Sequence, residues 1–301
     1  MLFRDTLIST IETIGIVSPS FFIEKQEKFE TGIKYLQEQG YKLRFGSTVF
    51  NREYNTTGTA MERAEDVNRM FMDSDIDLIM ATDGGCRAIE LLEYLDYDAI
   101  KNNPKPICGF SDITHILLAI YSKTQNPCIH GMDLMNGFGQ PDSCMKEKNV
   151  FNFFQTLTKN RVEMNFEKTR VLKRGSGSGV AIGGWLNAIH NLVGTKFFPQ
   201  NEKMVLFWEA IDEEPNRINM MLWSLRLSGL YERLNAMVIG RLTNCVEKEY
   251  FDCIPSIEDM ILEACKGYNF PIIIGAPFGH GCEMSAFKQG DIININTEEF
   301  V

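Results

Sequence analysis

The amino-acid sequence predicts an α/β protein with two parts: an N-terminal, mainly parallel sheet flanked by helices, and a smaller C-terminal domain of mixed α/β structure. Three observations predict this fold class. The composition is that of an ordinary globular protein, with 44% hydrophobic and 23% charged residues in a chain of 301. Short apolar runs alternate with amphipathic stretches through the first half. A polar interval after about residue 145 then precedes a second series of apolar runs.

The first half of the chain alternates strand and helix signals in a regular order. An apolar run at residues 13–20 ends in a Ser-Pro-Ser turn, and residues 25–39 have helical spacing that stops at Gly40. The same alternation predicts strands at 41–45, 76–81 and 106–110 and helices at 60–73, 87–95 and 112–123. A β-α-β-α-β order implies parallel strands covered by helices. In such sheets, functional sites form outside the carboxyl ends of the strands.

The second half has its own strand and helix signals. We expect strands at 204–208, 236–239 and 271–275 and helices at 218–227 and 256–265. The Gly/Ser-rich segment at 173–179 is interpreted as a flexible connector without chemistry. The sequence therefore predicts an N-terminal domain at 1–150, an interdomain linker at 151–175 and a C-terminal domain at 176–301.

The charge balance and the first residues of the chain limit the expected partners and compartment. The formal net charge is −10, and no run rich in Lys and Arg is interleaved with aromatic residues. Nucleic acid is therefore not an expected partner. The acidic Glu12 comes before any apolar run long enough for a signal peptide or a membrane span. We expect a cytoplasmic protein that does not enter a membrane.

Eight cysteines and four histidines are scattered along the chain without a C-x-x-C pair. Most of the cysteines lie in apolar surroundings, which is typical of reduced core thiols. Disulfide bonds and a zinc site are therefore not expected. A metal cluster would need carboxylates from distant segments, which the sequence cannot place.

Ser111 is the most distinctive polar residue of the first half. It stands between a predicted buried strand and an apolar helix, where a tight turn can expose its hydroxyl and the helix amino end can stabilise an oxyanion. This arrangement suits acyl transfer. The surrounding Gly109-Phe110-Ser111-Asp112-Ile113 is not G-x-S-x-G, however, and serine and aspartate are also common helix caps. For His115, one helical turn later, we expect a packing or surface role rather than that of a base.

A Gly84-Gly85 pair follows one predicted strand and precedes a helix. The position resembles a phosphate-binding turn, but the chain has neither a G-x-G-x-x-G pattern nor a P-loop lysine there. This disfavours nucleotide binding, and with it a nucleotide-dependent oxidoreductase. The two glycines could instead bring a backbone amide close to a substrate as an oxyanion donor, or they could form a plain turn with positive φ.

Two residues of the second half are candidates for acid–base chemistry. His280 lies between Gly279 and Gly281 after an apolar run, and flanking glycines can expose the ring as a loop-borne base requires. Glu209 ends the apolar run at 204–208 and could orient a histidine. The alternative interpretations are a polar loop residue for His280 and a solvated boundary charge for Glu209.

The order of these residues resembles the serine LD-carboxypeptidase family, which includes murein tetrapeptide LD-carboxypeptidases and microcin C immunity peptidases. The resemblance spans almost the whole chain. Its blocks are residues 15–20, 80–85, 91–98, 103–105, 109–114, 182–184, 194–195, 206–209, 217–218, 225–226 and 275–280. The chain departs from the familiar pattern at Cys86-Arg87, after the glycine pair, and at Trp185, where Gly-Gly-Asn is usual.

The resemblance implies a serine carboxypeptidase whose Ser-Glu-His triad falls on Ser111, Glu209 and His280. It also implies oxyanion donors at the backbone amides of Gly85 and Asp112, an acyl-enzyme mechanism, and no metal or organic cofactor. The implied substrate is a small peptide, a murein tetrapeptide that loses D-alanine, and the implied assembly is a homodimer. The same triad would serve an immunity-type peptidase that cleaves the amide of a peptide-nucleotide antibiotic. A noncatalytic ligand-binding protein on the same fold is a further alternative.

Overall fold

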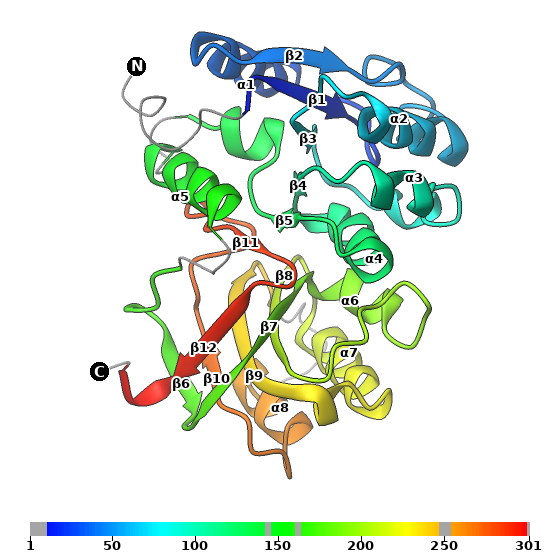
Figure 1. Cartoon of the computed structure of the whole chain (residues 1–301). Coiled ribbons are helices and arrows are strands. Elements are labelled where there is room, and N and C mark those ends of the chain that lie inside the picture. Colours follow the sequence, from blue (N-terminus) through cyan, green and yellow to red (C-terminus); the bar gives the residue numbers. More distant parts are fainter. Residues whose placement is uncertain (1–10, 142–145, 160–163, 247–253, 300–301) are drawn as a thin grey trace.

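The computed structural model describes residues 11–141, 146–159, 164–246 and 254–299 and contains two sheets, one above the other in Figure 1. Each sheet consists mostly of parallel strands and is flanked by helices. The α/β fold expected from the sequence is therefore confirmed. Among the described residues, no helix has the length and hydrophobicity that a membrane span requires.

The N-terminal sheet contains the first five strands of the chain and one strand from near its end. Its order is β11 (Phe287–Lys288), β5 (Cys128–His130), β4 (Ile107–Gly109), β3 (Leu78–Ala81), β1 (Thr13–Val17) and β2 (Lys42–Phe45). All pairs are parallel except that of β11 with β5. Helices α1 (Gln26–Glu38) and α5 (Lys146–Thr158) cover one face, and α2 (Ala60–Met72), α3 (Tyr97–Asn102) and α4 (Thr114–Thr124) cover the other (Figure 1).

The burial pattern of β3 explains why helices cover both faces of this sheet. All four of its residues are buried, and successive side chains of a strand point to opposite faces. Ile79 and Ala81 belong to the apolar cluster formed with α2 and α4, whereas Leu78 and Met80 belong to the cluster that contains Phe29 of α1. A strand buried on both faces reads as a continuous apolar run, and that run made β3 recognisable in the sequence.

The C-terminal sheet has a parallel centre and antiparallel edges. Its order is β12 (Ile292–Asn296), β7 (Ser176–Trp185), β8 (Met204–Ile211), β9 (Leu234–Thr243), β10 (Ile272–Ile274) and β6 (Arg170–Lys173). The edge strands β12 and β6 run antiparallel to their neighbours. Helices α6 (Leu186–Leu192), α7 (Pro215–Leu227) and α8 (Ile257–Ala264) pack on one face. The short helices are Ala88–Leu91, Ser111–Ile113, Leu134–Phe138, Leu230–Arg233 and Thr297–Glu299.

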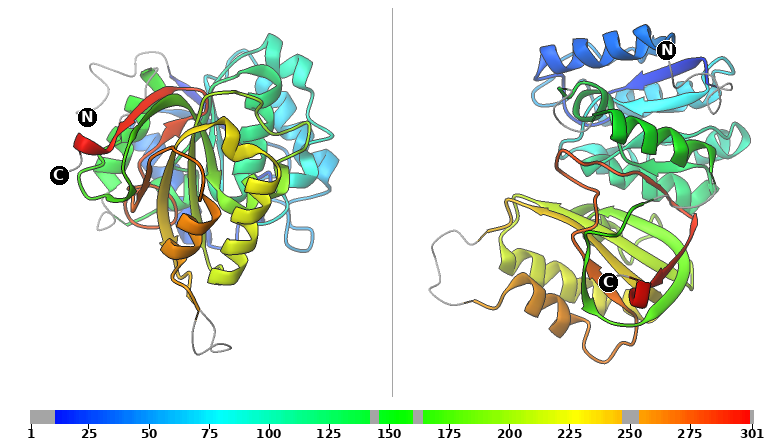
Figure 2. Two further views of the ribbon diagram at one scale, coloured as in Figure 1. Left: turned by 90° about the horizontal axis from the view of Figure 1, so that it is seen from below. Right: turned by 90° about the vertical axis from the view of Figure 1, so that its left-hand side faces the viewer.

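The two sheets are joined by a shared apolar core and by one strand. Ile116 of α4 belongs to the same buried cluster as Ile189 of α6 and Trp208 of β8. Strand β11 lies late in the sequence but pairs with β5 of the N-terminal sheet, after which the chain returns to the C-terminal sheet as β12. The path of the chain from β11 in one sheet to β12 in the other can be followed in Figures 1 and 2. The strand that leads to Ser111, β4, and the strand that contains Glu209, β8, therefore belong to two sheets that pack together through one core.

Several segments differ from the sequence-based expectation. The expected flexible connector at 173–179 instead enters β7 at Ser176. A Cβ on Gly177 would lie 1.7 Å from the carbonyl oxygen of Asn235, so the glycine reflects close packing of backbones rather than flexibility. The expected linker at 151–175 contains the end of α5 and all of β6, which pairs with β10. The exact domain boundary stays a prediction. The helix expected at 87–95 is only the short 3-10 helix Ala88–Leu91.

One cysteine also departs from the expectation of reduced thiols, because Cys282 is disulfide-bonded. The other described cysteines, Cys86, Cys108, Cys128, Cys245 and Cys265, are free. Disulfide pairing depends on distances between segments remote in sequence, so the spacing of the cysteines alone could not reveal it.

Candidate active site

Ser111 lies at the tight turn that joins β4 to α4. Strand β4 ends at Gly109, Phe110 is extended, and a short 3-10 turn that begins at Ser111 leads into the helix. Ser111 has a φ of 57°, which is uncommon for a residue other than glycine. Backbone strain of this kind persists where the surrounding structure enforces it, often at functional sites. Ser111 therefore occupies the carboxyl end of a central parallel strand, where the sequence predicts it.

The Gly84-Gly85 turn lies directly against Ser111. A Cβ on Gly84 would lie 2.9 Å from the Cβ of Ser111 and 3.6 Å from the amide nitrogen of Asp112. Gly85 has a φ of 144°, and a Cβ there would lie 2.4 Å from the hydroxyl oxygen of Ser20. Both positions therefore require glycine. The amides of Gly85 and Asp112, which the family resemblance assigns to the oxyanion, lie in segments that are in contact.

Glu209 and His280 form a hydrogen-bonded pair. His280 Nδ1 lies 2.7 Å from Glu209 Oε2, and the backbone N–H of His280 donates to the same oxygen at 3.4 Å. Glu209 is fully buried in β8. The loop reaches it through Gly279, which has a φ of 98° and whose added Cβ would lie 2.7 Å from the Cβ of Glu209. Because the carboxylate accepts the proton on Nδ1, Nε2 is the nitrogen free to act as a base.

A single cavity of about 260 Å³ connects the two halves of the site. Ser111 and His280 both line it, and their neighbouring residue Phe110 packs against His280 with ring centroids 4.9 Å apart. The remaining lining residues are Lys25, Asp83, Gly84, Gly85, Asn136, Gln140, Gly281 and Met284. The structure thus places the candidate nucleophile Ser111 and the candidate base His280 at one cavity, although they come from different halves of the chain. Lys25 and Asp83 give this cavity charges of both signs.

The buried carboxylate of Asp112 organises the turn behind Ser111. Its Oδ2 accepts hydrogen bonds from the hydroxyl of Ser20 at 2.5 Å and from the amide of Ala88 at 2.7 Å, and its Oδ1 lies 3.0 Å from His115 Nδ1. Burial opposes ionisation, but the contacts with His115, Ser20 and Ala88 outweigh it and hold the pKa of Asp112 below its usual value. His115 is buried, so it has a packing role, as one of the two expected alternatives stated.

His130 is a buried neighbour of His280 that sequence reasoning missed. It ends β5, and its ring stacks on Phe287 with centroids 5.0 Å apart while contacting Phe110 and Phe278 edge to face. Neither ring nitrogen has a hydrogen-bond partner among the described residues. Burial, and then the charge of His280, lowers the pKa of His130 to about 3. The sequence around His130 carries no signal that distinguishes it from an ordinary core residue.

The geometry also bears on two other kinds of chemistry, a metal centre and a thiolate nucleophile. In the described residues, no group of three or more His, Cys, Asp or Glu side chains is placed to hold a metal ion. Cys86 stands beside the Gly84-Gly85 turn, but desolvation and the nearby Asp112 raise the pKa of its thiol. Cys86 is therefore a neutral thiol at neutral pH rather than a thiolate nucleophile.

Two family patterns together cover most of the chain. Residues 14–131 match the LD-carboxypeptidase N-terminal domain, and residues 178–295 match the LD-carboxypeptidase C-terminal domain. The chain belongs to the LD-carboxypeptidase family. In this LD-carboxypeptidase, Ser111 lies in the first matched region, and Glu209 and His280 lie in the second. The family inferred from the sequence is confirmed, and the protein is a serine-type carboxypeptidase.

The LD-carboxypeptidase is similar to its relatives along nearly its whole length. It is 28% identical over 311 residues to the microcin C7 self-immunity protein MccF of Escherichia coli, covering 93% of this chain and 89% of the relative. It is 27% identical over 287 residues to the murein tetrapeptide carboxypeptidase of Pseudomonas aeruginosa, covering 92% and 91%. The solved structure of MccF in complex with aspartyl sulfamoyl adenosine matches it with a TM-score of 0.88 at 25% identity, covering 98% and 96%.

Proposed function

We propose that this LD-carboxypeptidase hydrolyses the LD peptide bond of a murein tetrapeptide and releases D-alanine through an acyl-enzyme on Ser111. The observation that carries the proposal is that Ser111 and His280 line one cavity while His280 is hydrogen-bonded to the buried Glu209. The similarity to the murein tetrapeptide carboxypeptidase of Pseudomonas aeruginosa supports the choice of substrate.

In the proposed acylation step, His280 Nε2 takes the hydroxyl proton of Ser111 as the serine oxygen attacks the carbonyl carbon of the scissile bond. Glu209 holds the ring by its Nδ1–H and stabilises the imidazolium. The amides of Gly85 and Asp112 donate hydrogen bonds to the oxyanion. His280 then gives its proton to the leaving nitrogen, the C–N bond breaks, and D-alanine departs.

In the proposed deacylation step, a water molecule attacks the ester carbonyl carbon and His280 accepts one of its protons. The ester C–O bond then breaks, and the proton returns from His280 to the oxygen of Ser111. The products are the tripeptide carboxylate and the original enzyme. This sequence needs no metal and no organic cofactor.

The direct test compares wild type with Ser111→Ala on a synthetic murein tetrapeptide, with free D-alanine measured by mass spectrometry. The wild type is expected to release D-alanine, and the variant is expected to be at least about 1,000-fold slower, because the covalent route is lost. Matching circular dichroism spectra and melting temperatures would show that the variant is folded. Undiminished release of D-alanine by Ser111→Ala would overturn the proposal.

A second candidate function is immunity-type cleavage of a peptide-nucleotide antibiotic by the same triad. It is favoured by the 28% identity to MccF and by the match to MccF in complex with aspartyl sulfamoyl adenosine. The ratio of kcat/KM for the murein tetrapeptide to kcat/KM for aspartyl sulfamoyl adenosine separates the two functions. A ratio above one supports the murein substrate, and a ratio below one supports the antibiotic.

We further propose that the enzyme acts in the cytoplasm as a homodimer. The support for both is the family resemblance of the sequence blocks that carry the site. One chain has a mass of 34.3 kDa, so light scattering after gel filtration is expected to give twice that value. Elution as a species of the single-chain mass at micromolar concentration would contradict the dimer.

A further inference from the structure

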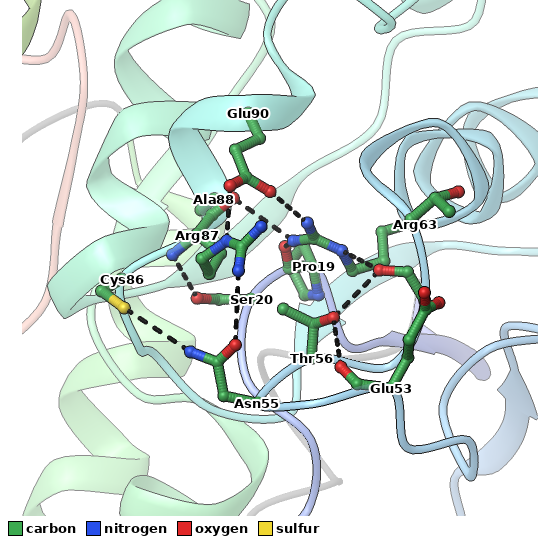
Figure 3. Close-up of polar contacts among 12 residues, drawn as sticks. Pro19, Ser20, Glu53, Asn55, Thr56, Arg63, Cys86, Arg87, Ala88 and Glu90 are labelled. Carbon is green, nitrogen blue, oxygen red and sulfur yellow. Dashed lines mark hydrogen bonds and ion pairs between the residues drawn. The ribbon is translucent and has the colours of Figure 1, made fainter.

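Ser20 links the two peptide segments that carry the proposed oxyanion donors. Its hydroxyl donates to Asp112 Oδ2 at 2.5 Å and accepts a hydrogen bond from the backbone N–H of Arg87 at 3.2 Å. The amide of Ala88 donates to the same oxygen of Asp112 at 2.7 Å. Asp112, which follows Ser111, is therefore joined to the backbone of Arg87 and Ala88, which follow the glycine pair. The Ser20 hydroxyl and Asp112 Oδ2 make the connection. Figure 3 shows Ser20 beside the backbone of Arg87.

The segment of Ser20 also contacts the glycine turn directly. A Cβ on Gly85 would lie 2.4 Å from the oxygen of Ser20, and the backbone N–H of Phe21 donates to the carbonyl of Gly84 at 3.3 Å. Ser20 is fully buried. The segment of Ser20 therefore packs directly against the glycine turn and is bonded to it through the backbone.

Arg63 of α2 holds the outer side of this arrangement. Its side chain is buried, and its Nη1 donates to the carbonyl oxygens of Pro19 at 2.6 Å and Arg87 at 3.3 Å. Its Nη2 donates to Glu90 at 2.7 Å (Figure 3). One guanidinium thus binds the residue before Ser20 and the residue that donates to Ser20, so the Ser20 hydroxyl is held from both sides.

We propose that Ser20 is a positioning residue that fixes the spacing between the amides of Gly85 and Asp112 and thereby the geometry of the oxyanion site. The inference rests on the proposed function, which gives those two amides their role. Oxyanion donors act at about 2.7–3.1 Å from the developing charge, and a misplacement of about 1 Å can reduce a rate by about 100-fold. A hydroxyl bonded to both segments resists a shift of either one.

The test uses Ser20→Ala with Ser18→Ala as its matched control. Ser18 is an equally buried serine two residues away, and its hydroxyl bonds to Thr82 Oγ1 at 2.7 Å rather than to Asp112 or to the backbone that follows the glycine pair. A fluorophosphonate probe is added, and phosphonylation of Ser111 is followed by intact mass. The probe needs no knowledge of the natural substrate, and its phosphoryl oxygen occupies the oxyanion site. We expect labelling to be about 10- to 100-fold slower in Ser20→Ala and within about 3-fold of wild type in Ser18→Ala.

Steady-state kinetics on the murein tetrapeptide separate positioning from a general loss of structure. For Ser20→Ala, kcat and kcat/KM are expected to fall by the same factor while KM is unchanged, because the oxyanion exists only in the transition state. Both serine variants are expected to lose a similar, small amount of melting temperature. If Ser20→Ala does not fold, Asp112→Asn tests the same positioning role. This variant keeps the backbone amide of residue 112 but weakens the acceptor for Ser20 and Ala88. We expect it to be labelled at least about 10-fold more slowly than wild type.

The outcomes distinguish this inference from the proposed function. Equal labelling rates for Ser20→Ala and Ser18→Ala, or a rise in KM with kcat unchanged, would overturn the positioning role alone. Labelling of Ser111→Ala as fast as wild type would overturn the proposed nucleophile, and the positioning role would fall with it. Labelling that requires Ser111 and slows selectively in Ser20→Ala supports both.

Discussion

At the scale of single residues, the site depends on backbone conformation as much as on its polar side chains. Ser111 adopts a positive φ, and Gly279 lets the loop of His280 approach Glu209 so closely that no Cβ fits between them. The hydrogen bond from His280 to Glu209 thus depends on the close approach that Gly279 permits. Replacing Gly279, and comparing it with a glycine of similar φ elsewhere, shows how much of the effect comes from the contact with Glu209 rather than from backbone strain.

Gly279→Ala is expected to lower kcat by at least about 10-fold and to destabilise the fold by about 1–3 kcal/mol. The added Cβ would meet Glu209 at 2.7 Å, so the loop must move and the His280–Glu209 pair must lengthen. Gly194→Ala is the matched control, because Gly194 also has a positive φ, 82°, but nothing lies within 4 Å of its Cβ. Kinetics and urea unfolding are the measurements. Equal kcat values for the two variants would show that the contact with Glu209 does not matter.

Glu209→Gln tests the carboxylate without changing its size. The glutamine keeps an oxygen near His280 Nδ1 but removes the charge that stabilises the imidazolium and allows the wrong tautomer. We expect kcat to fall by about 100- to 10,000-fold with KM nearly unchanged. Steady-state kinetics on the tetrapeptide provide the measurement. A kcat within about 3-fold of wild type would rule out an orienting role for Glu209.

The sequence could predict site residues whose local pattern is itself informative. Ser111 follows a buried strand and precedes an apolar helix, and His280 lies between glycines, so both were recognisable from their neighbours. The local sequence around Glu209 did not distinguish it from a boundary charge. Only the family resemblance, in which the blocks occur in the same order, linked it to Ser111 and His280. Ser20 and His130 could not be found, because their partners are remote: the bond from Ser20 to Asp112 spans 92 positions. Burial and partners of this kind exist only once the chain has folded.

At the scale of elements, helix α2 supplies a buried cation to the loops that surround the site. Arg63 donates to the carbonyl oxygens of Gly58 and Pro19 and to the carboxylate of Glu90. Helix α2 begins with a capping box between Thr59 and Glu62, so the first turn that carries Arg63 is well fixed. The guanidinium therefore ties the loop after β1, at Pro19, and the loop before α2, at Gly58, to the Ala88–Leu91 helix.

Arg63→Met is expected to lower the free energy of unfolding by about 3–5 kcal/mol, because it leaves Glu90 and buried carbonyl oxygens without their donor. Arg69→Met on the same helix is the control. Its ion pair with Glu65 is largely exposed, and such pairs contribute about 0–1 kcal/mol. Urea titration of both variants gives the comparison. A loss for Arg63→Met no larger than that for Arg69→Met would contradict the role of the buried guanidinium.

Helices and strands were predictable where their burial produces a recognisable pattern of apolar residues in the sequence. Strand β3 and residues 204–208 of β8 are continuous apolar runs, and both were recognised as strands. Strand β7 begins with alternating glycine and serine, a composition typical of a loop, and only the approach of Asn235 explains it. Strand β11 has two residues, too few for any period, and it exists because the edge of β5 is available to pair with it.

At the scale of the whole molecule, an aromatic cluster around His130 joins the two domains. Phe110 directly follows β4 and precedes Ser111, whereas Phe278 and Phe287 lie on either side of His280 in the later part of the chain. His130 is the ring that all three contact. Its neutrality is a condition for this packing, because a buried imidazolium without a hydrogen-bond partner would be strongly disfavoured.

The depressed pKa of His130 predicts a loss of stability in mild acid. The unfolded chain takes up a proton at this residue below about pH 6.5, whereas the folded state does so only near pH 3. Between those values the unfolded state binds more protons, so the free energy of unfolding falls by up to about 1.4 kcal/mol per pH unit as pH decreases. His130→Phe is expected to flatten this slope between pH 6.0 and 4.5. Urea titrations at several pH values provide the test, and identical slopes for variant and wild type would contradict it.

Strand β11 has a consequence for how this enzyme can be divided. It belongs by sequence to the part of the chain that carries His280, yet it completes the sheet that carries Ser111. An N-terminal half made alone would present the bare edge of β5, and exposed strand edges recruit other chains. We therefore expect that the halves cannot be exchanged between relatives as separate modules, because the segments that carry Ser111 and His280 complete one another's sheet and must fold together.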